Sequence, residues 1–302
     1  MNSRHAHYIL TVLEEGSISN AAKKLFISQP SLSQMIHTIE QKLHIKIFNR
    51  HTSPISLTFA GTKYVEAAKK ILTINRNLTT ALNEINDETH GVIRVGISIH
   101  RSMYLLPQIL PAFTDKYPDV DLRLIEDSSS KIEELACNEE IDLAFVNPER
   151  QREELEYLLL QRERMVLSSS IETDLAKSLA PGSEILISAA KEEKFIALHR
   201  GQGVRVIQDK MFSEADISPK IVVETKSVEV ARRLAIACKA VTIYPETMLN
   251  QLENLKGCSA YFPIKGEQFK RSFYLCYNKN LYLSKFMKEF ITITQAVLSQ
   301  SK

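Results

Sequence analysis

The chain has 302 residues, of which 44% are apolar and 25% are charged. These proportions are typical of a folded globular protein of two or three domains and exclude a disordered or fibrous chain. The sequence contains no run of 18 apolar residues and no basic leader followed by an apolar stretch. We therefore expect neither a membrane span nor a secretory signal, and a cytoplasmic location.

The formal net charge of +2 is unevenly distributed along the chain. Residues 1–58 carry six Lys or Arg against three Glu, which gives +3, so the remaining residues total −1. This imbalance suits a polyanionic partner for the N-terminal part alone.

The four cysteines are far apart, and no Cys-x-x-Cys pair occurs. This spacing argues against a zinc site or a disulfide framework, so we expect no metal and no cofactor. Reduced, mostly buried thiols are the favoured interpretation. A redox pair of Cys137 and Cys238 is the alternative.

Residues 17–40 predict two short helices around a tight turn. In the second helix Leu32, Ile36, Ile39 and Leu43 recur at intervals of four, three and four, which forms one stripe that can be buried. Ser28 is a candidate N-cap, and Pro30 falls in the first turn, where a missing amide hydrogen costs little. The opposite face carries short or forked hydrogen-bonding side chains suited to reading base edges. Its members are Pro30, Gln34, His37 and Gln41, with Ser33 at its edge.

An earlier amphipathic helix through Tyr8 and Val12 is expected to end at Gly16 in a left-handed cap. Any three-helix bundle shows such stripes, so spacing alone leaves a purely structural bundle open. Residues 46–50 and 54–58 alternate apolar and polar around a short turn, which predicts a β-ribbon wing. Lys46 and Arg50 on this wing are candidate phosphate contacts, although an isolated Arg on a hairpin is often only a solvated charge.

Residues 59–85 contain no proline and predict one long helix, which Thr58 can cap. An apolar seam follows it through Tyr64, Ala68, Leu78 and Leu82, which suits pairing with a second copy of the chain. A helix packed only on its own chain is the alternative. The polar residues 86–91 then predict a hinge.

From residue 91 strands alternate with helices, which predicts parallel α/β sheets in two lobes with a cleft between them. Expected helices span 131–137, 204–212, 228–238 and 281–298, with another through Leu105 and Phe113. Expected strands lie at 92–97, 120–125, 141–146, 165–168, 195–198, 221–224, 241–244 and 272–277.

Over its whole length the chain resembles the LysR-type transcriptional regulators. The residues that carry the resemblance are Gly16-Ser17-Ile18, Ala21-Ala22, Leu25, Ser28-Gln29-Pro30-Ser31-Leu32-Ser33, Ile39-Glu40, Leu43, Phe48-Asn49-Arg50 and Leu57-Thr58-Phe59-Ala60-Gly61, and more loosely Leu106-Pro107, Tyr117-Pro118, Ile141-Asp142-Leu143-Ala144 and Tyr244-Pro245. The segments 168–194 and 237–240 depart from the family pattern. In the first of these, residues 185–187 could form an extra strand or a packing surface.

The resemblance implies an α/β multidomain protein. A winged helix-turn-helix DNA-binding domain would occupy residues 1–58, and a linker helix with a hinge would occupy 59–90. A two-lobed α/β effector domain similar to type 2 periplasmic binding proteins would occupy 91–302, with lobe I at about 91–163 and 266–302 and lobe II at about 164–265. The implied partners are double-stranded DNA, a small-molecule effector, further copies of the chain in a homodimer or homotetramer, and RNA polymerase.

The candidate DNA-binding residues combine the family's contact positions with the polar helix face and the wing. They are Gln29, Pro30, Ser31, Ser33, Gln34, His37, Lys46, Arg50 and Thr52.

Effector-binding residues are expected at strand ends facing the cleft, where hydroxyls and cations at helix starts suit an anion. Serine capping of a helix, and simple solvation of Lys226, are the alternatives. The candidates are Ser98, His100, Arg101, Ser102, Ser128, Ser129, Gln202, Gly203, Thr225, Lys226, Ser227 and Tyr244.

These observations predict an effector-responsive transcriptional regulator with no catalytic residues. An enzyme would need a convergent nucleophile and base or a phosphate loop, and neither pattern occurs in the sequence. A transport-type solute-binding protein would explain the lobes, but it would have no use for the N-terminal helices.

Overall fold

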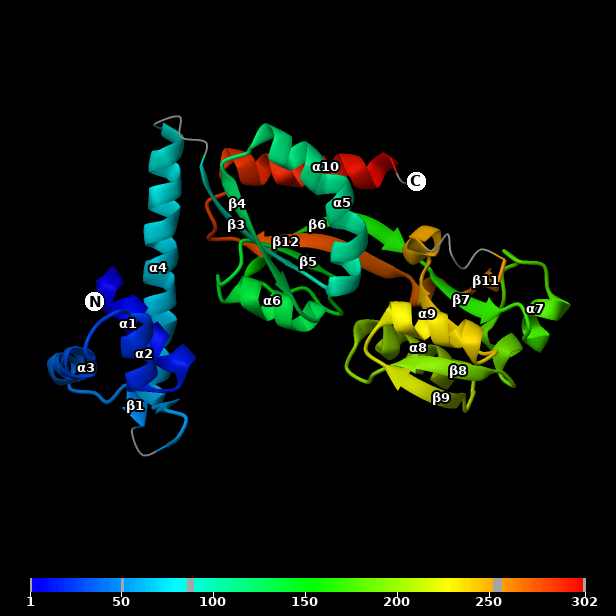
Figure 1. Ribbon diagram of the computed structural model, residues 1–302, viewed down its shortest axis with the longest axis horizontal. Coiled ribbons are helices and arrows are strands. Elements are labelled where there is room, and N and C mark those ends of the chain that lie inside the picture. The colour runs from blue at the N-terminus through cyan, green and yellow to red at the C-terminus, as the bar shows by residue number, and fades with distance from the viewer. Residues whose placement is uncertain (1, 50–51, 86–89, 252–256, 301–302) are drawn as a thin grey trace. The chain divides into compact units, whose positions relative to one another are not determined.

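The computed structural model describes residues 2–49, 52–85, 90–251 and 257–300 (Figure 1). The chain forms two compact units. The first comprises Met1–His90 with Asn280–Lys285, and the second comprises Gly91–Lys279 with Phe286–Lys302. Most of the predicted hinge, residues 86–89, lies outside the described residues.

The first unit is a three-helix bundle with a two-stranded wing and a long fourth helix. Its core is formed by apolar side chains from all four helices and the wing, among them Ile9, Leu32, Ile36, Phe48 and Ala68. This arrangement agrees with the predicted winged helix-turn-helix followed by one long helix. The elements are α1 (Ser3–Glu15), α2 (Ile18–Lys24), α3 (Gln29–Leu43), β1 (Phe48–Asn49), β2 (Ser56–Leu57) and α4 (Phe59–Ile85).

Local capping explains where these helices begin and end. Gly16 adopts φ 59°, a left-handed conformation that glycine reaches without strain, and it ends α1 as predicted. The backbone N of Ser31 donates to the Ser28 hydroxyl at 3.3 Å, which confirms Ser28 as the N-cap of α3. The Gly61 backbone N donates to the Thr58 hydroxyl at 2.9 Å at the start of α4.

The second unit contains two five-stranded sheets, here called lobe I and lobe II (Figure 1). In lobe I the strand order is β4-β3-β5-β12-β6, with α5 and α10 on one face and α6 on the other. Phe113 of α5 and Phe145 of β5 both contact Phe290 of α10, which places an aromatic core on the first face. The elements are β3 (Gly91–Ile97), α5 (Ile99–Lys116), β4 (Val120–Glu126), α6 (Ser129–Cys137), β5 (Leu143–Val146), β6 (Leu155–Glu163), β12 (Arg271–Asn278) and α10 (Lys285–Gln300).

Lobe II has the strand order β11-β7-β10-β8-β9. Its core includes Phe195, Met211, Tyr244 and Phe262. The elements are β7 (Met165–Ser170), α7 (Asp174–Ser178), β8 (Lys194–Leu198), α8 (Gly203–Glu214), β9 (Lys220–Thr225), α9 (Val228–Ala237), β10 (Val241–Pro245) and β11 (Ser259–Pro263), with short 3₁₀ helices at Ile187–Ala190, Glu246–Gln251 and Glu267–Phe269.

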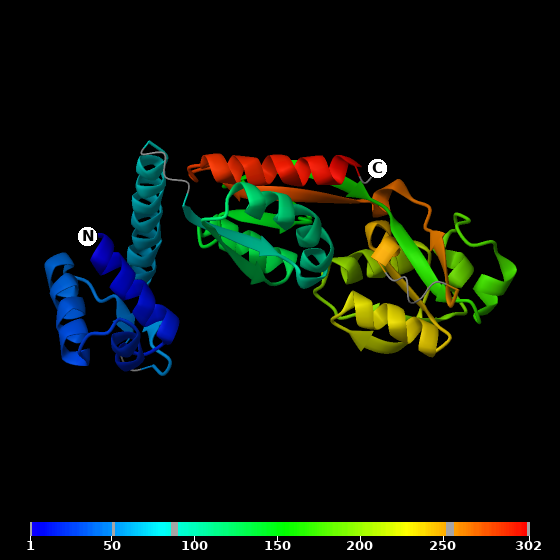
Figure 2. The same cartoon turned by 45° about the horizontal axis from the view of Figure 1, so that its top comes forward.

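The chain passes between the lobes twice, each time from a strand of one sheet to a strand of the other. Only Arg164 separates β6 of lobe I from β7 of lobe II, and the chain returns from β11 to β12 (Figure 2). Because β12 enters lobe I from the opposite direction, it pairs antiparallel with β5 and β6, and β7 likewise pairs antiparallel with β10 and β11. The sheets are therefore mixed, and the prediction of parallel sheets was wrong for these strands.

Three further expectations need correction. Strands β6 and β11 were not predicted. The segment at 185–187 forms no strand, since Ile185 makes one isolated bridge to Ile264 and Ile187 begins a 3₁₀ helix. The thiols are not mostly buried, because Cys238 and Cys258 are exposed and only Cys276 is buried. Among the described residues, no helix is both long enough and apolar enough to cross a membrane.

Candidate nucleic-acid interface and interlobe cleft

Helix α3 buries its apolar stripe inside the first unit. Leu32 and Ile36 are fully buried and Ile39 nearly so, whereas Leu43 is 50% exposed. Leu43 therefore departs from the predicted stripe, and it lines a surface pocket with His5 of α1 and Tyr64 of α4. The inward stripe fixes the orientation of the opposite, polar face.

The polar face of α3 is open in its own unit. Gln29, Pro30, Ser31 and Gln34 are exposed, and Ser33 and His37 are partly exposed. Within the part of the chain that the structure describes, the side chains of Gln29, Gln34 and His37 make no hydrogen bond. Because these forked groups have unused donors and acceptors, they can bond to base edges without first breaking internal bonds.

The wing is tied to α3 by a buried carboxylate. Glu40 is 1% exposed, and it accepts a hydrogen bond from the Ile47 backbone N at 2.8 Å. Its second oxygen lies 3.3 Å from the exposed ammonium of Lys46. The structure therefore gives Lys46 an internal partner while leaving it accessible at the surface.

The other two candidate residues of the wing are Thr52 and Arg50. Thr52 is exposed, but its hydroxyl donates to the Asn49 carbonyl at 3.0 Å and accepts from the Ser56 backbone N at 3.1 Å. The Thr52 side chain thus closes the turn of the wing. Arg50 lies outside the described residues.

In the second unit, His100 connects the two lobes. Its Nε2 lies 3.3 Å from the Val228 backbone N, which donates to it, and 3.4 Å from the Lys226 carbonyl. Gln202 donates to the same carbonyl at 2.8 Å. The structure therefore brings together three of the predicted residues, from the starts of α5, α8 and α9. Burial lowers the pKa of His100, which favours the neutral ring.

A second group of predicted residues lines a cavity between the lobes of about 900 Å³. Ser128, Ser129 and Gly203 lie in its wall. The Ser128 hydroxyl accepts from the Lys131 backbone N at 3.4 Å, and the Ser129 hydroxyl accepts from the Asn147 backbone N at 2.8 Å. Ser128 thus caps α6, as the capping alternative anticipated, whereas Ser129 binds the backbone that follows β5.

Arg101 and Ser102 point into internal contacts. Arg101 is 9% exposed, and its guanidinium is paired with Glu163 and stacked 4.1 Å from the centre of the Phe273 ring. Ser102 donates to Glu126. Burial alone would raise the pKa of Glu163, but the adjacent guanidinium groups hold it below its usual value. Arg101 is therefore already matched by an anion of the chain itself.

Of the remaining predicted residues, Thr225, Lys226 and Ser227 lie at the start of α9, Ser98 lies before α5 and Tyr244 lies in β10. Ser227 caps α9 by accepting from the Val230 backbone N at 3.3 Å, and Thr225 accepts from the Ser227 backbone N at 3.2 Å. Lys226 is exposed, and Ser98 is partly exposed with no capping bond from its side chain. Tyr244 is buried in the core of lobe II beside Arg232. The wall of the 900 Å³ cavity contains none of these five predicted residues.

Two family models match almost the entire chain. Residues 86–299 match the LysR substrate binding domain, and residues 3–62 match the bacterial regulatory helix-turn-helix protein of the lysR family. The chain belongs to the LysR family. It is therefore a DNA-binding transcriptional regulator with a ligand-binding domain, as the sequence motifs predicted.

Relatives of this LysR-family chain span nearly its full length. A probable RuBisCO transcriptional regulator of Trichormus variabilis is 28% identical over 292 residues, which cover 95% of this chain and 84% of the relative. The uncharacterized HTH-type transcriptional regulator YcgK of Bacillus subtilis is 25% identical. The matched region covers 100% of this chain and 96% of YcgK.

Solved structures of the family share the fold. Full-length OxyR from Pseudomonas aeruginosa has a TM-score of 0.73 at 19% identity, with 99% of this chain and 97% of that chain covered. Full-length CbnR in complex with its target DNA has a TM-score of 0.63 at 20% identity, with both chains fully covered.

The cavity of this LysR-family protein also contains residues that the sequence reasoning missed. Asn147 follows the end of β5, and its side chain donates to the Ser272 carbonyl at 2.9 Å. The strand-end rule that selected Ser98 and Ser128 could have found it. Arg271 is the first residue of β12, so the strand-end rule does not select it. The direction in which β12 enters lobe I was not predicted either.

Proposed function

We propose that the exposed face of α3 reads a specific double-stranded DNA site. The single observation that carries this proposal is the open polar face of α3, opposite the buried Leu32 and Ile36, on which Gln29, Gln34 and His37 make no side-chain hydrogen bond among the described residues. The proposed contacts are the set predicted above, with Gln29, Ser33 and Gln34 at base edges and Lys46 and Arg50 at phosphates. Chromosomal DNA as the target places the protein in the cytoplasm.

We propose further that the protein acts as a dimer through α4. The first half of this helix packs on its own bundle, where Tyr64 and Ala68 are buried. The second half exposes Ile74, Leu78 and Leu82 at 66%, 56% and 49%, one above another at intervals of four residues. An apolar stripe of this kind suits a second copy of the chain. Pairing of dimers into a tetramer, and a contact with RNA polymerase, belong to the proposal on the strength of the family.

An anionic effector is the third part of the proposal. The wall of the 900 Å³ cavity carries five basic residues against two acidic ones, Glu133 and Glu149. Glu133 is already engaged by the Tyr157 hydroxyl and by Arg152. Binding between the lobes would shift the population between two arrangements of the DNA-binding domains, because the effector has different affinities for them.

Quantitative binding of the full-length protein to DNA tests the function. Duplexes from the region flanking its own gene are compared with scrambled duplexes of equal length and composition, by fluorescence anisotropy at several salt concentrations. We expect one flanking segment to bind about 10³-fold or more tightly than its scrambled version. Affinity for both should fall with salt. Equal affinity for every duplex would contradict sequence-specific regulation.

A further inference from the structure

Arg271 extends from lobe I to the beginning of a lobe II helix. It is the first residue of β12 and lies in the cavity wall. A Cβ atom placed on Gly203, the first residue of α8, would lie 3.3 Å from its Nη2. The guanidinium therefore lies against the N-terminus of a 12-residue helix that belongs to the other lobe.

This guanidinium has no matching anion. The carboxylate that acts on it belongs to Glu163, which is opposite Arg271 in the strand register. However, one oxygen of Glu163 is paired with Arg101 and the other accepts from the Thr247 hydroxyl at 2.8 Å. Throughout the described ranges, Arg271 makes no side-chain hydrogen bond and no ion pair. One carboxylate thus faces two guanidinium groups, which leaves one positive charge in excess.

The surroundings make this excess charge unfavourable without a ligand. Burial lowers the pKa of Arg271 to about 10; Glu163 opposes that shift and Arg101 adds to it. Removing a cation from water without an anion costs free energy, which an incoming anion recovers. Arg271 lines the open cavity and is partly exposed there.

The start of α8 offers donors for the same anion. Its N-cap, Gln202, makes no capping bond with its side chain, and Gly203 carries no Cβ to obstruct a close approach to the backbone. Amide groups at a helix N-terminus bind carboxylate and phosphate groups well. A planar guanidinium binds the same groups through two parallel hydrogen bonds.

We propose that Arg271 is the residue that receives the charged group of the effector, a carboxylate or a phosphate, and holds it against the N-terminus of α8. The inference rests on the proposed role of the cleft as the effector site. One anionic group would then bridge β12 of lobe I and α8 of lobe II, so its binding would favour the arrangement in which these elements are close together.

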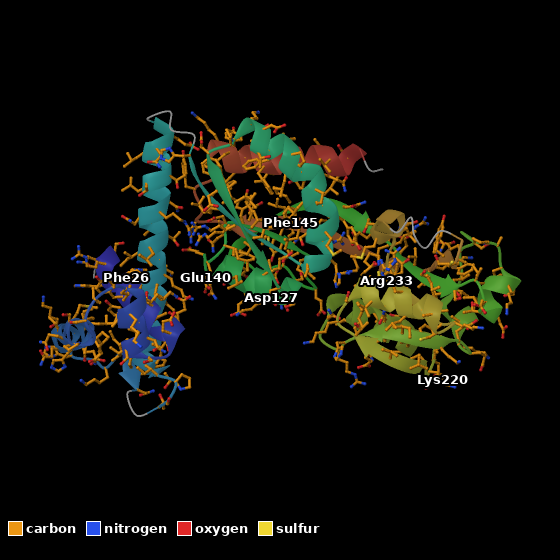
Figure 3. The ribbon with its side chains drawn as sticks, viewed as in Figure 1. Phe26, Asp127, Glu140, Phe145, Lys220 and Arg233 are labelled. Carbon is orange, nitrogen blue, oxygen red and sulfur yellow. The ribbon has the colours of Figure 1, made fainter. Side chains whose placement is uncertain are left out.

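The test uses the full-length chain with citrate and pyrophosphate as probes, each compared with chloride at equal ionic strength. Thermal unfolding and calorimetric titration are measured for the natural protein, for Arg271→Gln and for Lys220→Gln. The last variant makes the same change of charge on the exposed β9 strand of lobe II (Figure 3). We expect at least one probe to stabilise the natural protein and Lys220→Gln equally. Arg271→Gln should bind it about tenfold or more weakly.

A second signature separates a binding residue from a structural one. Because Arg271 lacks an internal anion, Arg271→Gln should unfold at the same temperature as the natural protein or higher when no probe is present. Arg271→Lys keeps the positive charge but loses the two-pronged guanidinium, so it should bind the probe with intermediate affinity. This variant provides the measurement if Arg271→Gln folds poorly.

The three possible outcomes have different consequences. Equal stabilisation of all variants by a probe would overturn the role of Arg271 while leaving the cleft as an anion site. A marked loss of stability of both Arg271 variants without any probe would show a structural role instead. If neither probe stabilises the natural protein, both this inference and the anionic effector fail, whereas DNA binding is tested separately by the anisotropy titration.

Discussion

At the residue scale, Phe26 occupies a backbone conformation that its side chain disfavours. It lies in the turn between α2 and α3 with φ 54° and is 96% exposed (Figure 3). The turn is set by backbone bonds from Phe26 N to the Lys23 carbonyl and from Ile27 N to the Ala22 carbonyl, at 3.1 and 3.0 Å. The helix-turn-helix geometry therefore imposes the left-handed conformation, and the Phe26 ring gains no burial in its own unit.

We expect Phe26→Asn to stabilise the first unit by about 1 kcal/mol, because asparagine tolerates the left-handed region better than a bulky residue does. Chemical denaturation measures this change. Phe59→Asn is the control, since Phe59 is 84% exposed but lies in a regular helix, and it should show no comparable gain. A loss of stability in Phe26→Asn would mean that the Phe26 ring makes contacts which the isolated chain does not reveal.

Also at the residue scale, His100 makes the stability of the fold depend on pH. Its Nδ1 is buried and has no partner among the described residues, and burial lowers its pKa below 6.5, with the Lys226 carbonyl and Glu229 opposing the shift. The unfolded chain therefore takes up the proton first as the pH falls. The stability associated with neutral His100 is complete above pH 6.5 and is lost progressively as the pH falls below it.

Replacing His100 with glutamine should flatten this dependence. We expect the unfolding temperature of the natural protein to fall more steeply below pH 6.5 than that of His100→Gln, because glutamine has no proton to take up. Differential scanning calorimetry over a pH series compares the two. Parallel curves would show that His100 does not titrate differently in the folded and unfolded states.

At the element scale, the second half of α4 exposes an apolar stripe that invites pairing. Leu78 lies at its centre and is 56% exposed in the single chain. Leu78→Asp should leave the folded chain intact while weakening dimerisation, since a buried leucine contributes roughly 1.5–3 kcal/mol in each copy. Analytical ultracentrifugation at several concentrations measures the monomer fraction.

Leu186→Asp is the matched control for this prediction. Leu186 is 62% exposed in lobe II, outside the proposed interface, and its replacement should not change the oligomeric state. A dimer of unchanged stability in Leu78→Asp would exclude the α4 stripe as the pairing surface.

Elements with a strong local signal could be predicted from the sequence, and those without one could not. Helices α3 and α4 show continuous 3.6-residue periodicity with caps at Ser28 and Thr58, so their starts were foreseen. Strand β6 mixes charged and apolar side chains without alternation, and β11 is five residues long and ends at Pro263. Both strands are defined by pairing with segments distant in sequence, which no local pattern records.

At the scale of the whole molecule, the two candidate sites also differ in how far the sequence predicts them. The α3 face depends on one helix and its bundle, so periodicity identified Ser33 and Gln34, and the family resemblance added Gln29. The cleft depends on two chain crossings between lobes. Strand-end reasoning found Ser128 and Gly203 there, but it could not foresee that Arg101 is matched by Glu163 or that Arg271 enters from β12.

The central claim is that the open face of α3 distinguishes one DNA sequence from another. The most direct measurement is the affinity of Gln34→Ala for a cognate duplex and for a scrambled duplex, with Gln108→Ala on α5 as the control. The account predicts a loss of about 1–3 kcal/mol on the cognate duplex only, with binding to the scrambled duplex nearly unchanged. An equal loss on both duplexes, or no loss on either, would contradict base reading by this residue.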